Sequence, residues 1–210
     1  EIGSGLVGSE MCIRDRPGDV KYVDVNHDGA IDANDKVDLG NGLPKYTFGL
    51  NLNLGYKGFD LSLNATGAAG FQIAQSYRDP NSSQSNYSRQ ILDRWTGEGT
   101  SNRIPRVTYG DVGNWQFSDL YLQEGDYIRL QNITLGYDFK RLISWKGLSK
   151  LRLYVQAQNL FTLTKYDGMD PEIGSFNGTD GNNNDTWVSG VDMGYYPHPR
   201  TFIVGINLAF

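Results

Sequence analysis

Hydrophobic and polar residues alternate with a period of two in five separate segments of the chain. In the first of these, from Tyr46 to Tyr56, every even position is Tyr, Phe or Leu and every odd position is Thr, Gly or Asn. This alternation is typical of a β-strand with one apolar and one polar face. The same pattern predicts strands near 46–56, 59–71, 126–139, 151–164 and 200–210.

Two details of these segments predict local geometry. Only Lys57 and Gly58 separate the first two strands, which indicates a two-residue hairpin turn with Gly at a position where a positive φ costs little. In the third strand, Ile128 and Leu130 are out of phase with the apolar positions that begin at Ile133. A change of phase within one strand predicts a β-bulge.

The strands are long, and their connections alternate between short and long. A tilted strand needs about nine to eleven residues to cross a bilayer, and each predicted strand has about that number or more. About 55 residues separate the second strand from the third, and about 35 separate the fourth from the fifth, which is unusual in a compact soluble domain. We therefore expect an all-β fold, an antiparallel transmembrane β-barrel with short periplasmic turns and long extracellular loops. A large soluble sandwich or barrel with the same alternation is the alternative.

Aromatic residues lie near the strand ends, as in the interfacial girdles of membrane barrels. These residues are Tyr46, Phe48, Tyr56, Phe59, Phe139, Phe161, Phe202 and Phe210. Five strands do not close such a barrel, because bacterial barrels of one chain have an even number of strands from about eight upward. The chain is therefore expected to hold about five C-terminal strands of a larger barrel, within 17–210. Residues 1–16, EIGSGLVGSEMCIRDR, lack both strand alternation and signal-peptide features, and resemble translated adaptor sequence, a non-native leader.

Composition narrows the class of protein. The 26 Gly residues and the aromatic share of 12% suit a β protein with hydrated loops. No apolar run approaches the ~18 residues that a membrane-spanning helix needs. The net charge of -5 argues against nucleic acid as a partner, and the single cysteine, Cys12, provides no disulfide framework.

The segment 17–44 contains a calcium-type loop, DVNHDGAIDAND. Its candidate oxygen ligands are Asp24, Asn26, Asp28, the carbonyl of Ala30, Asp32 and Asp35. Gly29 fits the sharp turn at the sixth position, but Asp35 stands where a bidentate Glu is usual. We expect a structural Ca²⁺. The alternative is an Asp- and Asn-rich turn closed by its own side-chain hydrogen bonds.

The last strand carries a candidate assembly signal. Its apolar face consists of Phe202, Val204, Ile206, Leu208 and Phe210. An alternating final strand that ends in Phe resembles the signal recognised by the outer-membrane barrel assembly machinery. The alternative is a terminal core strand of a soluble protein.

No catalytic constellation is visible. His27 and His198 lie in loops without a convincing partner, and there is no phosphate-binding loop, nucleophile elbow or Cys/His cluster. We therefore expect no enzyme, and substrate-binding residues stay unknown. Arg152, Gln156 and Gln158 are expected on the lumen side of their strand. The long loops contain aromatic residues that either pack the loops together, which we favour, or form a platform for sugar rings. These residues are Trp95, Tyr109, Trp115, Trp187, Tyr195 and Tyr196.

Longer motifs resemble one known family. The runs PGDVKYVDVNHDGAIDANDK and LPKYTFGLNLNLGYKGFDLSL are similar to the C-terminal third of the SusC/RagA group of TonB-dependent transporters. So are RWTGEGTSNRIPR, SDLYLQEGDYIRLQNITLGYDF, LSKLRLYVQAQNLFTLTKYDGMDPE and GYYPHPRTFIVGINLAF, in that order along 17–210.

The resemblance implies an outer-membrane protein of a Gram-negative, Bacteroidetes-like bacterium that imports glycans or other oligomeric nutrients. It implies a SusD-like surface lipoprotein as a partner, and coupling to the TonB complex through an N-terminal region that this sequence lacks. Two alternatives stay open: a soluble calcium-stabilised β module that binds carbohydrate, and a passive porin.

Overall fold

The protein forms two compact units, each assembled from three separate stretches of the chain. The computed structural model describes residues 16–76, 89–107, 114, 116–143, 145–173 and 190–210, and the backbone of 2–4. The first unit comprises Glu1–Gly42, Ile73–Gln123 and Ser175–Gly194. The second comprises Leu43–Gln72, Glu124–Gly174 and Tyr195–Phe210.

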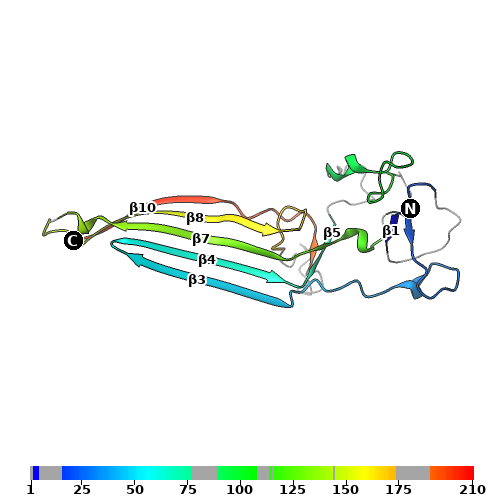
Figure 1. The fold of residues 1–210 in the computed structure, drawn as a ribbon, viewed down its shortest axis with the longest axis horizontal. Coiled ribbons are helices and arrows are strands. Elements are labelled where there is room, and N and C mark those ends of the chain that lie inside the picture. Colours follow the sequence, from blue (N-terminus) through cyan, green and yellow to red (C-terminus); the bar gives the residue numbers. More distant parts are fainter. Residues whose placement is uncertain are drawn as a thin grey trace, which may run out of the picture. The chain divides into compact units, whose positions relative to one another are not determined.

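The second unit is built on one long antiparallel sheet of five strands. The strands are β3 (Tyr46–Tyr56), β4 (Phe59–Ala69), β7 (Tyr127–Asp138), β8 (Lys150–Thr164) and β10 (Thr201–Ala209). They lie side by side in the order β10-β8-β7-β4-β3 (Figure 1). Each strand begins and ends within about two residues of its predicted bounds, because a half-buried strand imposes its period of two on the sequence.

Both local predictions for this sheet are confirmed. Lys57 and Gly58 have φ values of 47° and 93°, the two positive values that a type I′ hairpin turn requires. The register of β7 shifts between Leu130 and Asn132 on its border with β8, and the border with β4 shifts at the same place. The bulge restores the apolar residues on either side of it to one face of the sheet.

The register places one set of side chains on each face. The outer face, as we call the apolar one, carries Leu52, Leu63, Ile133, Ala157 and Phe202 in a single cross-strand row. The neighbouring row on the opposite, inner face is polar. It consists of Asn51, Asn64, Asn132, Gln158 and Thr201. The alternation in the sequence thus becomes a separation of chemistry between two surfaces.

The first unit contains shorter elements that the alternation did not predict. The strand β2 (Val20–Tyr22) pairs in parallel with β1 (Ile2–Ser4). A separate sheet has the order β6-β5-β9, formed by β6 (Leu122–Glu124), β5 (Gln72–Gln75) and β9 (Val191–Asp192). Val20, Ile73, Ser118 and Asp192 are buried in this unit. Strands of two to four residues are too short to display a period of two.

All helices in the described part of the chain are single 3₁₀ turns or little longer. They are η1 (Ala33–Asp35), η2 (Arg89–Asp93), η4 (Asp119–Tyr121) and, at the end of β7, η5 (Phe139–Arg141). Among the described residues, no helix is long and apolar enough to cross a membrane.

Candidate functional site

The outer face of the five-stranded sheet is apolar and open to its surroundings. Leu50 in β3 is 57% exposed and Val204 in β10 is 73% exposed, although both residues lie in the middle of long strands. The large apolar side chains exposed on this face also include Phe48, Leu52, Leu54, Leu135, Leu153, Val155, Phe202, Ile206 and Leu208. A continuous apolar surface of this extent requires an apolar environment such as lipid.

The inner face is polar along the same strands. The Asn64 side-chain amide donates a hydrogen bond of 2.5 Å to Oδ1 of Asn51 on the neighbouring strand. Gln156 and Gln158 lie on this face, opposite Thr134 and Asn132 in β7, as the sequence predicts. The sheet therefore separates an apolar side from a hydrated side, as the wall of a barrel must.

An ion pair lies on the inner face near the end of the sheet where the Lys57–Gly58 turn joins β3 to β4, which we call the turn end. Nε of Arg152 donates to Oδ1 of Asp60 at 2.7 Å, and Nη2 donates to Oδ2 at 2.5 Å. The pair passes over Gly136, where an added Cβ would lie 2.5 Å from both Arg152 Nε and Asp60 Oδ1. The guanidinium also lies 4.8 Å from the ring centroid of Tyr154. Arg152 thus faces the lumen side as predicted, but its charge is neutralised by Asp60.

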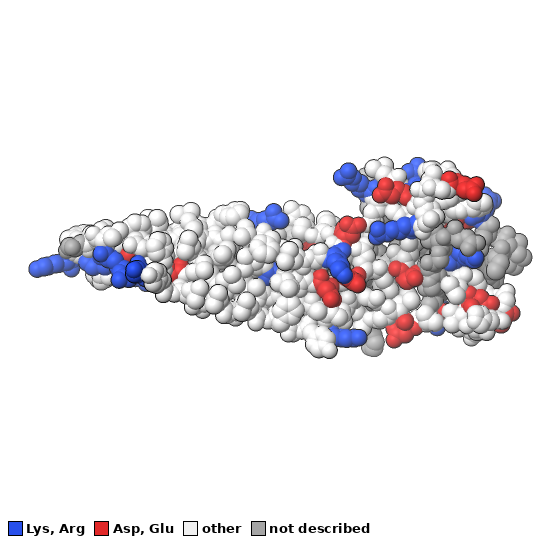
Figure 2. Space-filling view, in the orientation of Figure 1, with Lys and Arg blue, Asp and Glu red and all other residues white. Residues whose placement is uncertain are grey.

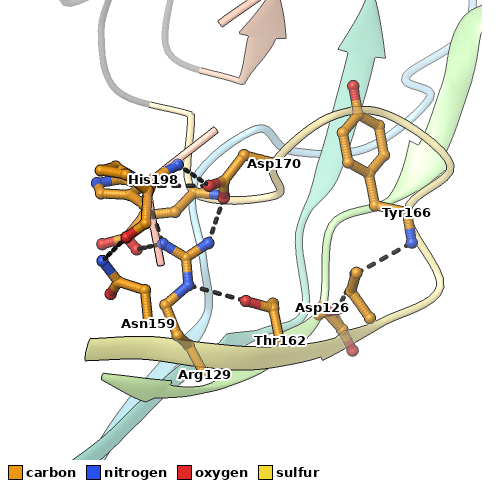
Figure 3. Close-up of polar contacts among 10 residues, drawn as sticks. Asp126, Arg129, Asn159, Thr162, Tyr166, Asp170 and His198 are labelled. Carbon is orange, nitrogen blue, oxygen red and sulfur yellow. Dashed lines mark hydrogen bonds and ion pairs between the residues drawn. The ribbon is translucent and has the colours of Figure 1, made fainter. Parts of the chain in front are cut away.

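At the opposite end of the sheet, a polar cluster surrounds Arg129 (Figure 3). Arg129 is 2% exposed and spreads its guanidinium over several acceptors. Nε donates to Oγ1 of Thr162 at 3.0 Å, Nη1 donates to Oε2 of Glu172 at 2.8 Å, and Nη2 pairs with Oδ1 of Asp170. Nδ1 of His198 lies 2.9 Å from the same Nη1. A guanidinium matches such a set because it carries five donors in a fixed plane.

This Arg129 cluster ties two loop segments to the end of the sheet. Asp170 lies in the segment after β8, and it accepts the backbone N–H of Glu172 at 2.9 Å and that of His198 at 3.1 Å. His198 lies in the segment before β10. Asn159, in β8, also binds this segment, because its Nδ2 donates to the Pro199 carbonyl at 3.1 Å. One buried carboxylate therefore fixes both segments, and Figure 3 shows them converging on the guanidinium.

The cluster also fixes the charge of Asp170. Burial raises the pKa of this carboxyl, but the N–H groups of Glu172 and His198 and the side chains of His198 and Arg129 outweigh it. The pKa of Asp170 is consequently lowered from its ordinary value. Asp170 is a charged partner of Arg129 at neutral pH, and the buried pair is electrically balanced.

The prediction that His198 has no convincing partner is wrong, since it contacts both Arg129 and Asp170. The partners are distant in the sequence, and no spacing rule connects them. One signal was present, because Asp170 precedes Pro171 and His198 lies between Pro197 and Pro199. Proline restricts the backbone on either side of a polar residue, which suits a residue held in one position. His27, by contrast, is exposed at a turn position with φ 60°.

The calcium-type loop is closed by its own hydrogen bonds. Gly29 N donates to Oδ2 of Asp24 at 2.8 Å, and Ala30 N donates to Oδ1 of Asp28 at 2.8 Å. Asp35 is fully buried and accepts the N–H groups of Val25 and Asp32 at 2.8 Å each. The hydrogen bond from Asp32 is the main reason that the pKa of Asp35 is lowered.

Metal binding by this loop stays a prediction. Asn26 and Asp32 use their side-chain oxygens for the Asp28 and Asn34 N–H groups, as the turn alternative predicts. Within the described residues, no group of three or more His, Cys, Asp or Glu side chains is arranged to hold a metal ion. One oxygen fits a ligand role, because Oδ1 of Asp24 is buried without a hydrogen-bond partner.

A second polar cluster organises the first unit. Arg106 donates to both carboxylate oxygens of Asp19, at 2.6 and 3.0 Å, and Nδ2 of Asn114 donates to the same group at 2.8 Å. Burial raises the pKa of Asp19, but these partners outweigh it and lower the pKa. Trp95 packs against Gly18, which leaves no space for a side chain there. This contact supports the expectation that Trp95 packs loops together.

The other predicted site residues are spread over different places. Phe202, Val204, Ile206 and Leu208 lie on the outer face of β10, and Phe210 follows the strand. Of the loop aromatics, Tyr195 contacts His198 at 6.5 Å between ring centroids and Tyr196 is 82% exposed. Tyr109, Trp115 and Trp187 lie outside the described residues.

Comparison with known proteins agrees with this geometry. The chain is 33% identical over 196 residues to TonB-dependent receptor P3 of Formosa agariphila, covering 92% of this chain and 19% of that protein. It is 30% identical over 200 residues to TonB-dependent receptor SusC of Bacteroides thetaiotaomicron, covering 93% of this chain and 18% of that protein. The chain thus spans about a fifth of the length of the curated relatives that it matches. No family model matches it.

Among solved structures, the RagAB peptide transporter matches with a TM-score of 0.62 and 25% identity, over 81% of this chain and 18% of that one. The fold and the two-sided sheet therefore define a section of the wall of an antiparallel transmembrane β-barrel. With the relatives above, the chain belongs to the SusC/RagA family of TonB-dependent receptors. These relatives are named as receptors and not as enzymes.

Proposed function

We propose that this chain forms part of the barrel wall of an outer-membrane TonB-dependent transporter that imports glycans or other oligomeric nutrients. The single observation that carries the proposal is the five-stranded sheet with an exposed apolar outer face and a polar inner face. A soluble calcium-stabilised module would have to cover this outer face with its own residues. In the described second unit, Leu50 and Val204 are instead left more than half exposed.

The proposal includes two partners. A SusD-like surface lipoprotein would capture the oligomer outside the cell, and the TonB complex would supply energy from the inner membrane. The family membership supports both, and one matched structure is described as a peptide transporter named RagAB. Peptides are therefore included with glycans among the oligomers to test.

The test is uptake by cells that carry or lack the complete receptor. The gene is deleted from the source bacterium, and the strain is grown on single oligosaccharides or oligopeptides, with and without a protonophore. We expect the deletion to abolish growth on at least one oligomer, and the intact gene to restore it only when the membrane is energised. Unchanged growth on every oligomer, or recovery of the protein from the soluble fraction, would contradict the proposal.

We also propose that Ca²⁺ stiffens the loop from Asp24 to Asp35. The spacing of oxygen-bearing residues and the unpartnered Oδ1 of Asp24 support this. In the purified receptor, Ca²⁺ should protect the peptide covering 24–35 from hydrogen exchange, and Asp24→Asn should remove that protection. Equal exchange with Ca²⁺ and with a chelator would leave the loop as a turn closed by hydrogen bonds alone.

A last proposal concerns assembly. The outer face of β10, with Phe210 after it, would be the segment that the barrel assembly machinery recognises. Phe210→Ala should lower the amount of folded receptor in the outer membrane. Tyr196→Ala, a change at another highly exposed aromatic residue, should leave that amount unchanged. Equal amounts of folded receptor in both variants would refute this assignment.

A further inference from the structure

Basic residues gather at the turn end of the five-stranded sheet, where β3 meets β4 and η5 follows β7. Figure 2 shows this end as a group of blue side chains beyond a white, uncharged band. The described basic residues at this end are Lys57, Lys140, Arg141, Lys146, Lys150 and Arg152. The described acidic residues there are Asp60 and Asp138. Positive charge therefore dominates this end.

The basic residues differ in their positions. Lys140 donates from Nζ to the Trp145 carbonyl at 2.7 Å. Arg152 is neutralised by Asp60 on the inner face, and Lys150, opposite Ala209 in the register, lies on that face too. Lys57, Arg141 and Lys146 lie in the turns themselves and are exposed. Three cations are thus presented beyond the end of the sheet.

The turns that carry these cations are joined to each other. The Gly58 carbonyl accepts the N–H of Asp138 at 2.8 Å, and the Arg141 side chain lies over Gly58, 2.8 Å from the position of an added Cβ. Nζ of Lys57 lies 5.2 Å from the centroid of the Tyr56 ring. The two turns therefore form a single rim, which we call the basic rim: Lys57, Arg141 and Lys146.

An aromatic belt lies next to the basic rim. The rings of Phe59 and Tyr137 are 4.4 Å apart, and those of Tyr137 and Phe139 are 4.9 Å apart, between centroids. In the β7–β8 connection, Leu142 and Trp145 are exposed apolar side chains. Aromatic rings mark the level of the lipid headgroups in membrane proteins. Cations just beyond them stand where headgroup phosphates lie.

We propose that the basic rim binds the phosphates of anionic phospholipids in the leaflet at the turn end of the sheet. This inference rests on the proposed location of the chain in a membrane wall. Charge complementarity selects the occupant, because polybasic segments at a membrane surface attract anionic lipids. Asp138 accepts the N–H of Lys140 at 2.9 Å and caps η5. Its carboxylate and that of Asp60 offset two of the six positive charges listed above, so this end keeps an excess of four positive charges among its described residues.

The loop end of the same unit shows no such excess. Its described acidic residues are Glu124, Asp126, Asp167, Asp170 and Glu172, and its described basic residues are Lys45, Arg129, Lys165 and Arg200. The charge of Arg129 is paired with Glu172 within its buried cluster, and Lys165 pairs with Glu124 at 3.0 Å. The two ends therefore differ in sign, and the attraction for anionic lipid is confined to the turn end.

The test uses the complete receptor, purified from the membrane and placed in nanodiscs that contain equal amounts of phosphatidylglycerol and phosphatidylcholine. Native mass spectrometry then counts the lipids that stay bound. We expect a several-fold preference for phosphatidylglycerol in the wild type. The variant Lys57→Gln/Arg141→Gln/Lys146→Gln should lose it, and the matched variant Lys45→Gln/Lys165→Gln/Arg200→Gln at the loop end should keep it.

Three results would overturn the proposal. These are equal retention of both lipids by the wild type, an unchanged preference in the turn-end variant, and displacement of the lipid by inorganic phosphate but not by chloride at the same ionic strength, which would indicate a site for free phosphate. All variants are first checked for a folded, heat-modifiable barrel. A wild-type receptor that fails this check would refute the proposed membrane location itself, and the two failures are thereby distinguished.

Discussion

Arg129 and Asp170, 41 residues apart in the sequence, form an ion pair that is almost completely hidden from solvent, with exposed fractions of 2% and 3%. The pair joins β7 to the segment that follows β8, and His198 adds the segment before β10. The Arg129 guanidinium and its partners therefore connect β7, the segment after β8 and the segment before β10. The alternation of apolar and polar residues does not predict these contacts. The stability of the loop end should depend on this pair.

Removing the cation should destabilise the protein strongly. Arg129→Ala leaves Asp170 buried without its charged partner, a change that costs about 3–5 kcal/mol in comparable sites. Chemical unfolding of the refolded receptor measures the loss. Lys165→Gln provides the control, because the Lys165–Glu124 pair is exposed on both sides and its loss should not change stability measurably. An equal effect of the two substitutions would contradict the importance of the buried cluster.

The cluster should weaken in acid. The lowered pKa of Asp170 means that the folded protein binds the proton less readily than the unfolded chain does. Its contribution to stability is therefore complete above the ordinary carboxyl pKa of 3.8 and is lost as the pH falls below that value through the folded pKa. Protection of the peptide covering 165–173 from hydrogen exchange, taken relative to the intrinsic exchange rate at each pH, should fall over that range. Asp170→Asn should show low protection at every pH, and protection that does not change with pH in the wild type would refute the prediction.

The ion pair on the inner face should require a glycine beneath it. A Cβ at Gly136 would lie 2.5 Å from both Arg152 Nε and Asp60 Oδ1, so Gly136→Ala should displace the pair and cost about 1–3 kcal/mol. Gly55→Ala is the matched control, because Gly55 lies in the same cross-strand row and the nearest atom to its added Cβ is 3.9 Å away. The unfolding midpoint of each variant measures the difference. Equal midpoints would mean that the pair adapts freely.

Charge should be tolerated on one face of β7 and not on the other. Leu135→Arg places a cation on the outer face, two residues from Tyr137 of the aromatic belt, where a charge facing lipid costs up to the ~4 kcal/mol of the bilayer midplane, decreasing towards the interface. Thr134→Arg places the same side chain on the inner face one residue away. Folded receptor in the outer membrane, counted by heat-modifiable mobility, should fall only for Leu135→Arg. Equal loss in both variants would argue against lipid on the outer face.

The sequence predicts the five-stranded sheet but not the Arg129 cluster, for a physical reason. Side chains of β3, β4, β7, β8 and β10 alternate because each strand has one apolar and one polar surface, so the pattern is local. Even the bulge was visible, since Ile128 and Leu130 change phase relative to Ile133. The partners of Arg129 are 33 to 69 residues away, and no local period encodes such contacts.

The alternation of apolar and polar residues does not predict the elements of the first unit, for a related reason. Its strands have two to four residues, and its order depends on contacts such as Arg106 with Asp19, which are 87 residues apart. The calcium-type loop shows the opposite case. Its residues were found by spacing, yet the same Asp and Asn side chains also close the loop by themselves, so spacing does not distinguish a metal site from a turn.

Spin-label accessibility measures directly which face of the five-stranded sheet contacts lipid. In the complete receptor reconstituted in bilayers, every native cysteine is replaced by Ser, and single cysteines at Leu63, Leu135 and Val204 carry spin labels. Matched labels occupy Ser62, Thr134 and Ile203 on the inner face. Labels on the outer face should be accessible to oxygen and shielded from a water-soluble nickel relaxant, and labels on the inner face should show the reverse. Equal access of the nickel reagent to both sets would contradict a membrane wall.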